Sequence, residues 1–293
     1  MPEASPIVDR LRERLRRTAS PAGGWAYYEA RNSRIEPTCW ALLATASPDN
    51  SAAAPHLAFL ASLQQPDGLL IELAGEPPNF SHNGLAAWVL QQIGSTGGPD
   101  VSRLIAGLTA AKGVKAGNDG SPQDNSLQAW SWVPDTFSWV EPTAWCVLAL
   151  KKSRAHTPSA AIDARIREAE AMLVNRACRE GGWNYGNATI LQQDLRPYVP
   201  TTALGLLAMS DLSANEAVQR SLMLLESTQL TEPSAFALAL TVLALRSLGR
   251  DTSIAQQALE DAVARAEARG HLHAIAMAAC ALSPTGAADP AHV

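Results

Sequence analysis

Hydrophobic positions along the chain follow a helical period, in stretches of two kinds. Some stretches are apolar on one side only, as at residues 158–177, where Asp163, Arg165 and Glu168 separate the apolar positions. Others, such as residues 199–210, are apolar almost throughout. A helix with one apolar face lies at a surface, whereas a helix that is apolar on all sides is buried. The alternation of the two kinds therefore predicts an inner ring of helices wrapped by an outer ring.

About twelve helices are expected, and no segment is typical of a strand. Their ranges are near residues 5–18, 37–46, 52–65, 81–93, 99–112, 141–152, 158–177, 199–210, 213–227, 233–248, 252–268 and 270–281. The connections from outer to inner helices are long, and those from inner to outer helices are short. All the long loops should therefore lie on one rim, beside the first turns of the inner helices, and long loops in a compact domain are often functional.

The starts of the inner helices repeat a short motif, in which proline is followed by threonine or serine. Its copies are Glu36-Pro37-Thr38, Glu141-Pro142-Thr143, Val199-Pro200-Thr201 and Glu232-Pro233-Ser234. Proline lacks an N–H group and is tolerated at the first position of a helix, where that group has no partner. Two copies follow a Gly-Gly-Trp turn, at residues 23–25 and 181–183. Loop and helix thus recur as one unit of roughly 40 to 50 residues, which is typical of stacked helical repeats.

Two further segments are distinctive. One is Glu180-Gly181-Gly182-Trp183-Asn184-Tyr185-Gly186, which leads to residues 199–204. The other is Leu63-Gln64-Gln65-Pro66-Asp67-Gly68. Both resemble the prenyltransferase and squalene oxidase repeat superfamily, which includes the triterpene cyclases, and the second is similar to the glutamine-rich repeat of squalene-hopene cyclases without its final tryptophan. The resemblance covers roughly residues 20–281 and implies an all-α fold, an α/α toroid (α6/α6 barrel) of about six helical hairpins. We expect a single domain over residues 1–293, with a short disordered tail at 283–293.

Charge and cysteine content exclude several classes of function. A net charge of −5 without a basic stripe argues against a nucleic-acid partner. The four cysteines have no Cys-x-x-Cys spacing, and no aspartate lies two residues before any of them. The zinc site of the related protein prenyltransferases is therefore not expected, nor is another metal or cofactor. Cysteines scattered in this way suit a reducing compartment, so we expect a cytoplasmic protein.

The chain has no apolar run long enough to span a bilayer. Residues 5–18 carry several arginines on an amphipathic pattern. This pattern is typical of an outer helix of the ring, and peripheral contact with a membrane surface is the second interpretation.

Glu141 is the candidate catalytic residue. The segment Trp139-Val140-Glu141-Pro142-Thr143-Ala144 is similar to the Asp-x-Asp-Asp-Thr-Ala motif of class II cyclases, whose middle aspartate protonates an alkene or epoxide. Glu141 occupies that position, but both flanking acids are absent. A glutamate in the first helical turn also interacts favourably with the helix dipole. Because Glu36 and Glu232 occur in the same frame, capping is the alternative role for all three, and two of these carboxylates can also meet at the mouth of the ring.

Candidate substrate-binding residues lie on the inner helices and in the long loops. Tryptophans of the inner helices either stabilise a carbocation by cation–π attraction or fill a narrow ring. His82 and Asn83 replace the Pro-Thr of the other repeats, so they mark either a site or a helix cap. Aromatic and acidic residues of the third and fourth long loops should lie at the rim. The complete set is Trp40, His82, Asn83, Trp88, Trp132, Asp135, Trp139, Trp145, Asp194 and Tyr198.

Three functions are consistent with these features. The first is a terpene cyclase-like toroid that binds an isoprenoid or another lipophilic small molecule in its central cavity and catalyses acid-initiated cyclisation or isomerisation. The second is a scaffold or binding module without catalysis, which the missing acids favour. The third is a glycan-processing α/α barrel in which two carboxylates do acid–base work. The candidates for that pair are Glu36, Asp135, Glu141 and Glu232. A homodimer or a second toroid subunit is a further partner hypothesis.

Overall fold

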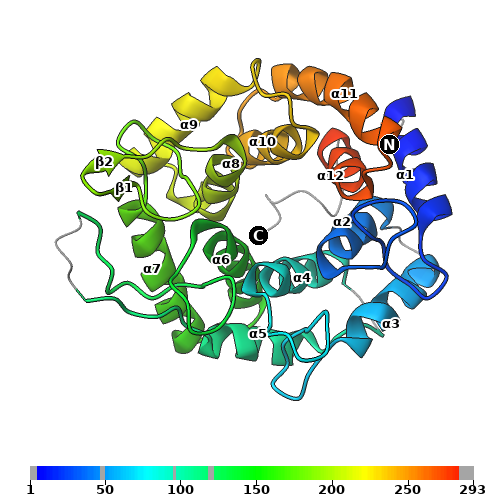
Figure 1. Cartoon of the computed structure of the whole chain (residues 1–293), viewed down its shortest axis with the longest axis horizontal. Helices are drawn as coiled ribbons and strands as arrows, with labels where there is room; N and C mark the ends of the chain where they lie inside the picture. The colour runs from blue at the N-terminus through cyan, green and yellow to red at the C-terminus, as the bar shows by residue number, and fades with distance from the viewer. Residues whose placement is uncertain (1–4, 47–49, 95–96, 118–121, 284–293) are drawn as a thin grey trace.

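The computed structural model describes residues 5–46, 50–94, 97–117 and 122–283. Within these residues twelve α-helices form two concentric rings (Figure 1). The outer ring consists of α1 (Pro6–Thr18), α3 (Ala54–Ser62), α5 (Val101–Ala110), α7 (Ala160–Asn175), α9 (Glu216–Thr228) and α11 (Ser253–Ala268). The inner ring consists of α2 (Ile35–Thr45), α4 (Phe80–Ile93), α6 (Val140–His156), α8 (Val199–Ala208), α10 (Ala235–Ser247) and α12 (Leu272–Leu282).

The inner ring is closed. Each inner helix contacts the next one in chain order, and α12 packs against both α10 and α2. Two contacts join the first long loop to the residues before α12. The Glu29 N–H donates to the Gly270 carbonyl at 3.0 Å, and the rings of Tyr28 and His271 stack with centroids 4.6 Å apart. The predicted α/α toroid is confirmed, including the alternation of outer and inner helices.

The inner helices begin slightly away from their prolines. Helices α2 and α6 start two residues before Pro37 and Pro142, so Glu36 and Glu141 are the second residues of their helices. Pro233 instead precedes the N-cap Ser234, whose side chain accepts the Ala237 N–H. The glutamates of the repeated motif are therefore not equivalent, because Glu232 lies outside its helix.

One structural element was not expected from the sequence. A hairpin of β1 (Thr189–Ile190) and β2 (Gln193–Asp194) lies in the loop before α8. Strands of this length are too short to show an alternating pattern. The turn residues Leu191 and Gln192 both have positive φ, 50° and 63°, and such turns usually contain glycine or asparagine, so the sequence carried no signal for the hairpin. Short 3-10 helices, η1 (Asn50–Ala53) and η2 (Ser210–Leu212), complete the described elements.

The predicted C-terminal tail begins at Ser283. The side chain of Ser283 is buried, and its Oγ accepts a hydrogen bond from Arg12 Nη2 at 3.1 Å. The rest of the predicted tail lies outside the described residues.

None of the helices in the described part of the chain is both long enough and apolar enough to cross a membrane.

A buried tryptophan links each of three loops to both rings. In the fourth repeat the Trp183 N–H donates to Thr202 Oγ1 at 3.0 Å, and its indole Nε1 donates to the Leu173 carbonyl at 2.7 Å. The preceding Gly181 and Gly182 have φ of 102° and 75°, which glycine adopts without strain. The same pattern connects Trp25 with Thr38 and Leu15, and Trp130 with Thr143 and Leu108. In all three cases the acceptor is the threonine at the fourth position of the inner helix, so its hydroxyl fixes the loop on the first turn of that helix.

Replacing Thr202 with valine should destabilise the protein by about 1 to 3 kcal/mol, because the isosteric side chain leaves the buried Trp183 N–H without its acceptor. Thr241→Val is the matched control, since the buried Thr241 hydroxyl donates only to the Ala237 carbonyl of its own helix. Urea unfolding of both variants measures the difference. Equal losses for the two variants would show that the loop hydrogen bond adds nothing.

Candidate functional site

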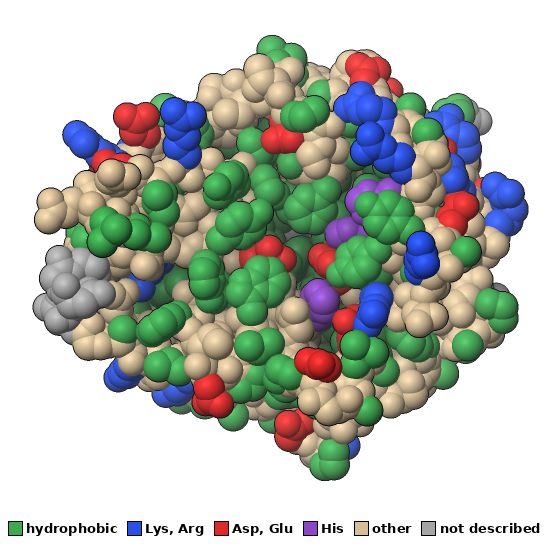
Figure 2. Space-filling view, viewed as in Figure 1, with side chains coloured by type: hydrophobic (Ala, Val, Ile, Leu, Met, Phe, Trp, Pro, Cys, Tyr) green, Lys and Arg blue, Asp and Glu red, His purple; other side chains and the backbone are tan. Residues whose placement is uncertain are grey.

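The first turns of the inner helices and the long loops lie on one face of the ring, which is hollowed at its centre. Figure 2 shows hydrophobic side chains around this hollow, with acidic and histidine side chains inside it. A cavity of about 40 Å³ lies there. Its walls are Glu36, Trp40, Glu141, Trp145, Tyr185, Pro200, Thr201, Leu204, Phe236 and Leu240. Carboxylates from the first and third repeats thus meet at one aromatic-lined cavity.

Glu141 is held in its neutral form. Burial raises the pKa of its carboxyl group to about 8, and the negative charge of Glu36 adds to this effect. The hydroxyl of Ser81 on α4 donates a hydrogen bond to Glu141 Oε1 at 3.2 Å, which acts in the opposite direction. At neutral pH the cavity therefore contains a protonated carboxylic acid.

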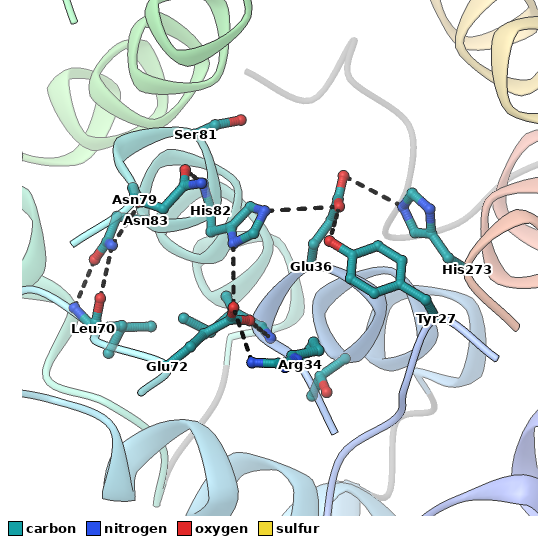
Figure 3. Close-up of polar contacts among 12 residues, drawn as sticks. Tyr27, Arg34, Glu36, Leu70, Glu72, Asn79, Ser81, His82, Asn83 and His273 are labelled. Atoms are coloured by element: carbon teal, nitrogen blue, oxygen red, sulfur yellow. Dashed lines mark hydrogen bonds and ion pairs between the residues drawn. The ribbon is translucent and has the colours of Figure 1, made fainter. Parts of the chain in front are cut away.

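Glu36 is the ionised partner. Burial alone would raise its pKa, but the surrounding donors outweigh burial and the pKa lies below its ordinary value. Nε2 of His273 lies 3.4 Å from Glu36 Oε1, Nε2 of His82 lies 3.8 Å from Oε2, and the Tyr27 hydroxyl donates to Oε2 at 2.5 Å (Figure 3). These groups come from α12, α4 and the first long loop, so the charge of Glu36 is stabilised from three sides.

A second carboxylate continues this network toward the rim. Glu72 Oε1 accepts the N–H of Ile35, the first residue of α2, at 2.5 Å. Glu72 Oε2 lies 3.9 Å from Nδ1 of His82 and 3.8 Å from Nη1 of Arg34 (Figure 3). His82 therefore lies between two acidic groups, and Glu72 links it to the start of the helix that carries Glu36.

The protonation of the neighbouring groups follows from burial and from Glu36. Burial lowers the pKa of His273, although the charge of Glu36 opposes this. Burial and Glu36 both raise the pKa of Tyr27, which therefore keeps its proton and remains a hydrogen-bond donor. At neutral pH the pair of carboxyl groups thus holds one exchangeable proton, on Glu141.

Three tryptophans close the ring beneath the cavity. Trp40, Trp88 and Trp145 have ring centroids 5.7 to 6.4 Å apart and are 1%, 2% and 4% exposed. Trp40 and Trp145 line the cavity, whereas Trp88 is not one of its lining residues. The indole N–H groups of Trp40 and Trp88 are buried without a hydrogen-bond partner. The three rings form an apolar floor, so the open space lies toward the loops.

A larger pocket of about 400 Å³ lies beside the cavity, among the third and fourth long loops. We call it the rim pocket. Tyr185 lines both spaces, and its ring packs against that of Tyr198 with centroids 5.2 Å apart. The rim pocket is lined by Phe137, Ser138, Trp139, Asn184, Tyr185, Gly186, Asn187, Ile190, Leu195, Arg196 and Tyr198.

The structure brings most of the residues expected from the sequence to this mouth. Glu141, Trp40 and Trp145 line the cavity, and Trp88 completes its floor. Trp139 and Tyr198 line the rim pocket, and His82 contacts Glu36.

Four residues lie elsewhere. Asn83 is fully buried, and its amide accepts the Leu70 N–H at 2.7 Å and donates to the Leu70 carbonyl at 3.0 Å. It therefore replaces the threonine of the other repeats in the packing of a loop. Asp194 is exposed and pairs with Arg179, and the exposed Asp135 occupies a turn position with φ of 60°. Trp132 lines neither the cavity nor the rim pocket. These four residues thus line neither of the two spaces.

Several residues of the site were not expected. Glu72, His273, Ser81 and Phe236 belong to none of the repeated motifs, whereas Tyr27 and Tyr185 each lie two residues after the tryptophan of a Gly-Gly-Trp turn. The two tyrosines thus had a signal in the sequence, and that of Tyr185 lies in the segment that carried the family resemblance. His273 lies far from Glu36 in the sequence and reaches it only through closure of the ring.

The described residues offer no cluster of metal ligands. None of their His, Cys, Asp and Glu side chains form a group of three or more that could hold a metal ion. The four cysteines are free and buried.

Comparison with solved structures identifies proteins of the same fold. A type II terpene cyclase from Scytonema, MstE with the substitution R337A and with its substrate geranylgeranyl dihydroxybenzoate, superimposes with a TM-score of 0.60 at 12% sequence identity, over 98% of this chain and 97% of the other. The same enzyme without ligand gives 0.54 at 16% identity, over 88% and 76%. A protein from Actinoplanes gives 0.59 at 15% identity, over 94% and 97%.

Sequence comparison alone identifies no relative. No family model matches the chain, and no curated protein matches it. The similarity therefore lies in the backbone, and the chain has an α/α-toroid fold like that of the type II terpene cyclases.

Proposed function

We propose that this toroid binds an isoprenoid or a similar lipophilic small molecule at its mouth, and that Glu141 donates the proton that starts its cyclisation or isomerisation. The observation that carries the proposal is a neutral carboxylic acid in a cavity with aromatic walls. A proton donor must hold its proton at the working pH, and the raised pKa of Glu141 ensures this. The substrate class of the structural neighbour, a geranylgeranyl compound, agrees with a lipophilic ligand.

The aromatic walls suit the charge that protonation creates. A carbocation is attracted to the face of an aromatic ring, most strongly to that of tryptophan. Trp40, Trp145 and Phe236 line the same cavity as Glu141. A positive charge formed there would be stabilised by these rings and by the carboxylate of Glu36.

Glu36 also completes the proton balance. Protonation by Glu141 leaves its carboxylate, and the cation must lose a proton from a neighbouring carbon to form an alkene. Glu36 is ionised and lies at the same cavity, so it can accept that proton and the pair can then return it to Glu141. The net reaction is an isomerisation or cyclisation without an oxidant or reductant.

The strength of the acid limits the substrate. A carboxylic acid with a pKa near 8 is a weaker proton donor than the same acid in water. Transfer to a basic atom is easier than transfer to an isolated alkene, because the efficiency of general acid catalysis follows the difference in acidity. Among lipophilic substrates, an epoxide or another oxygen-bearing isoprenoid therefore suits Glu141 better than a plain alkene.

The test is turnover by the Glu141→Gln variant. The purified protein is incubated with squalene, isoprenoid epoxides and prenyl diphosphates, and products are separated by gas chromatography and identified by mass spectrometry. Removal of a general acid should slow conversion at least about 100-fold, while the Glu232→Gln control, which keeps its acceptor for the Ser234 N–H, should be as active as the wild type. Unchanged turnover by Glu141→Gln would remove the catalytic assignment.

A binding module without catalysis is the second candidate. The space beside Glu141 is only about 40 Å³, whereas the rim pocket of about 400 Å³ lies among the third and fourth long loops, and Glu141 does not line it. A ligand held in the rim pocket alone would not need to reach the acid. Binding of an isoprenoid without conversion by the wild type would favour this candidate.

A further inference from the structure

The rim pocket contains a single charged lining residue, Arg196. Its other walls are aromatic, aliphatic or neutral polar side chains. Arg196 is exposed, and no described residue forms an ion pair or a hydrogen bond with its guanidinium group. The neighbouring Arg179 differs, because it pairs with Asp194 at 3.6 Å. Arg196 is therefore an uncompensated cation beside an apolar surface.

Two helix N-termini add positive potential to the same pocket. Trp139 and Tyr198, which line it, are the N-cap residues of α6 and α8. Neither side chain caps its helix with a hydrogen bond. The N-terminus of a helix carries a partial positive charge and favours anions. Arg196 and the two helix ends thus favour an anion at the rim independently of each other.

The inner cavity has the opposite preference. Glu36 is ionised there, and Glu141 holds a proton. An anion placed beside Glu36 would be repelled in a buried environment, where charges are weakly screened. Because Tyr185 lines both spaces, one ligand can extend from the rim pocket toward the cavity only with its anionic end outward.

We propose that the rim pocket binds the anionic head group of an amphiphile, a carboxylate or a phosphate, through Arg196. The apolar body of the ligand packs on Trp139, Tyr185 and Tyr198, and its neutral end points toward Glu141. This inference rests on the proposed binding of a lipophilic molecule and specifies its class. It also orients the ligand, since only the uncharged end meets the acid.

The test compares three ligands with the same fifteen-carbon chain: farnesol, farnesoic acid and farnesyl monophosphate. Isothermal titration calorimetry with the full-length protein, below the concentration at which each ligand forms micelles, gives the affinities. We expect at least one of the anions to bind roughly tenfold more tightly than farnesol, as for one charge-assisted contact, and the two anions separate a carboxylate from a phosphate preference. In Arg196→Gln this preference should disappear while the affinity for farnesol stays the same. The Arg179→Gln control should keep the preference.

The outcomes separate this inference from the proposed function. Equal affinity of the wild type for all three ligands, or a preference that survives in Arg196→Gln, overturns the role of Arg196 and leaves lipophilic binding intact. Failure of all three ligands to bind overturns this inference, whereas the proposed function fails only if squalene, isoprenoid epoxides and prenyl diphosphates are neither bound nor converted. Circular dichroism spectra of the variants exclude unfolding as the cause of a lost preference.

Discussion

Replacing Glu141 with glutamine should make the protein more stable than the wild type at pH 8.5, by about 3 to 5 kcal/mol, and equally stable at pH 4. An unfolded glutamate releases its proton near pH 4.5, whereas folded Glu141 holds it to about pH 8. Between these values the unfolded chain gains free energy from ionisation that the folded chain does not. The contribution of Glu141 to stability is therefore fully present below about pH 4.5 and is lost progressively as the pH rises to 8. Glutamine cannot ionise, so the variant does not suffer this loss.

Guanidinium unfolding at pH 4, 6 and 8.5 measures the effect. The difference between variant and wild type is the relevant quantity, because Glu36 and the buried histidines titrate in both proteins. Glu232→Gln is the control, since Glu232 lies before its helix and only accepts the Ser234 N–H, and it should show no such pH dependence. A constant difference between Glu141→Gln and the wild type at all three pH values would mean that Glu141 is ionised in the folded protein.

The ring architecture was predictable because it depends on patterns that repeat. The apolar inner helices and the amphipathic outer helices differ in composition, and the Pro-Thr motif marks the start of the inner ones. The meeting of Glu36 and Glu141 followed from the same repetition, since both are the second residues of inner helices that face one mouth. Such positions are fixed by helix geometry alone.

The charged network could not be predicted because it depends on closure of the ring. His273 on the last helix and Tyr27 in the first loop meet Glu36 only because α12 packs against α2. No local pattern in the sequence records that contact. The rim pocket is similar, since it is built from side chains of two loops, where no periodicity fixes the direction of a side chain.

Asn83 shows how a departure from a repeat misleads. The sequence departs from Pro-Thr at this repeat, which suggested a site. The cause is one loop earlier, where Leu70 stands in place of the buried tryptophan. The spacing of 13 residues between Asn83 and Leu70 is the same as that between Thr38 and Trp25 and between Thr143 and Trp130. An amide side chain makes both backbone hydrogen bonds of that loop, so the substitution preserves the structure.

Replacing Trp88 with alanine should destabilise the protein by about 3 to 5 kcal/mol and open a cavity in the floor of the ring. Trp88 is 2% exposed and packs against Trp40 and Trp145. Its indole N–H has no partner, so the loss reflects packing alone. Trp132→Ala, at a partly exposed loop tryptophan, should cost less.

Rescue by indole tests whether the floor is rigid. An apolar cavity that stays open binds a small apolar molecule, and binding to the folded state alone raises the melting temperature. Millimolar indole should therefore raise the melting temperature of Trp88→Ala and leave that of Trp132→Ala and the wild type unchanged. If Trp88→Ala lost little stability and did not respond to indole, Trp40 and Trp145 would have collapsed into the space. The cavity beside Glu141 would then be enlarged from below, and the three tryptophans would not act as a fixed floor for a ligand.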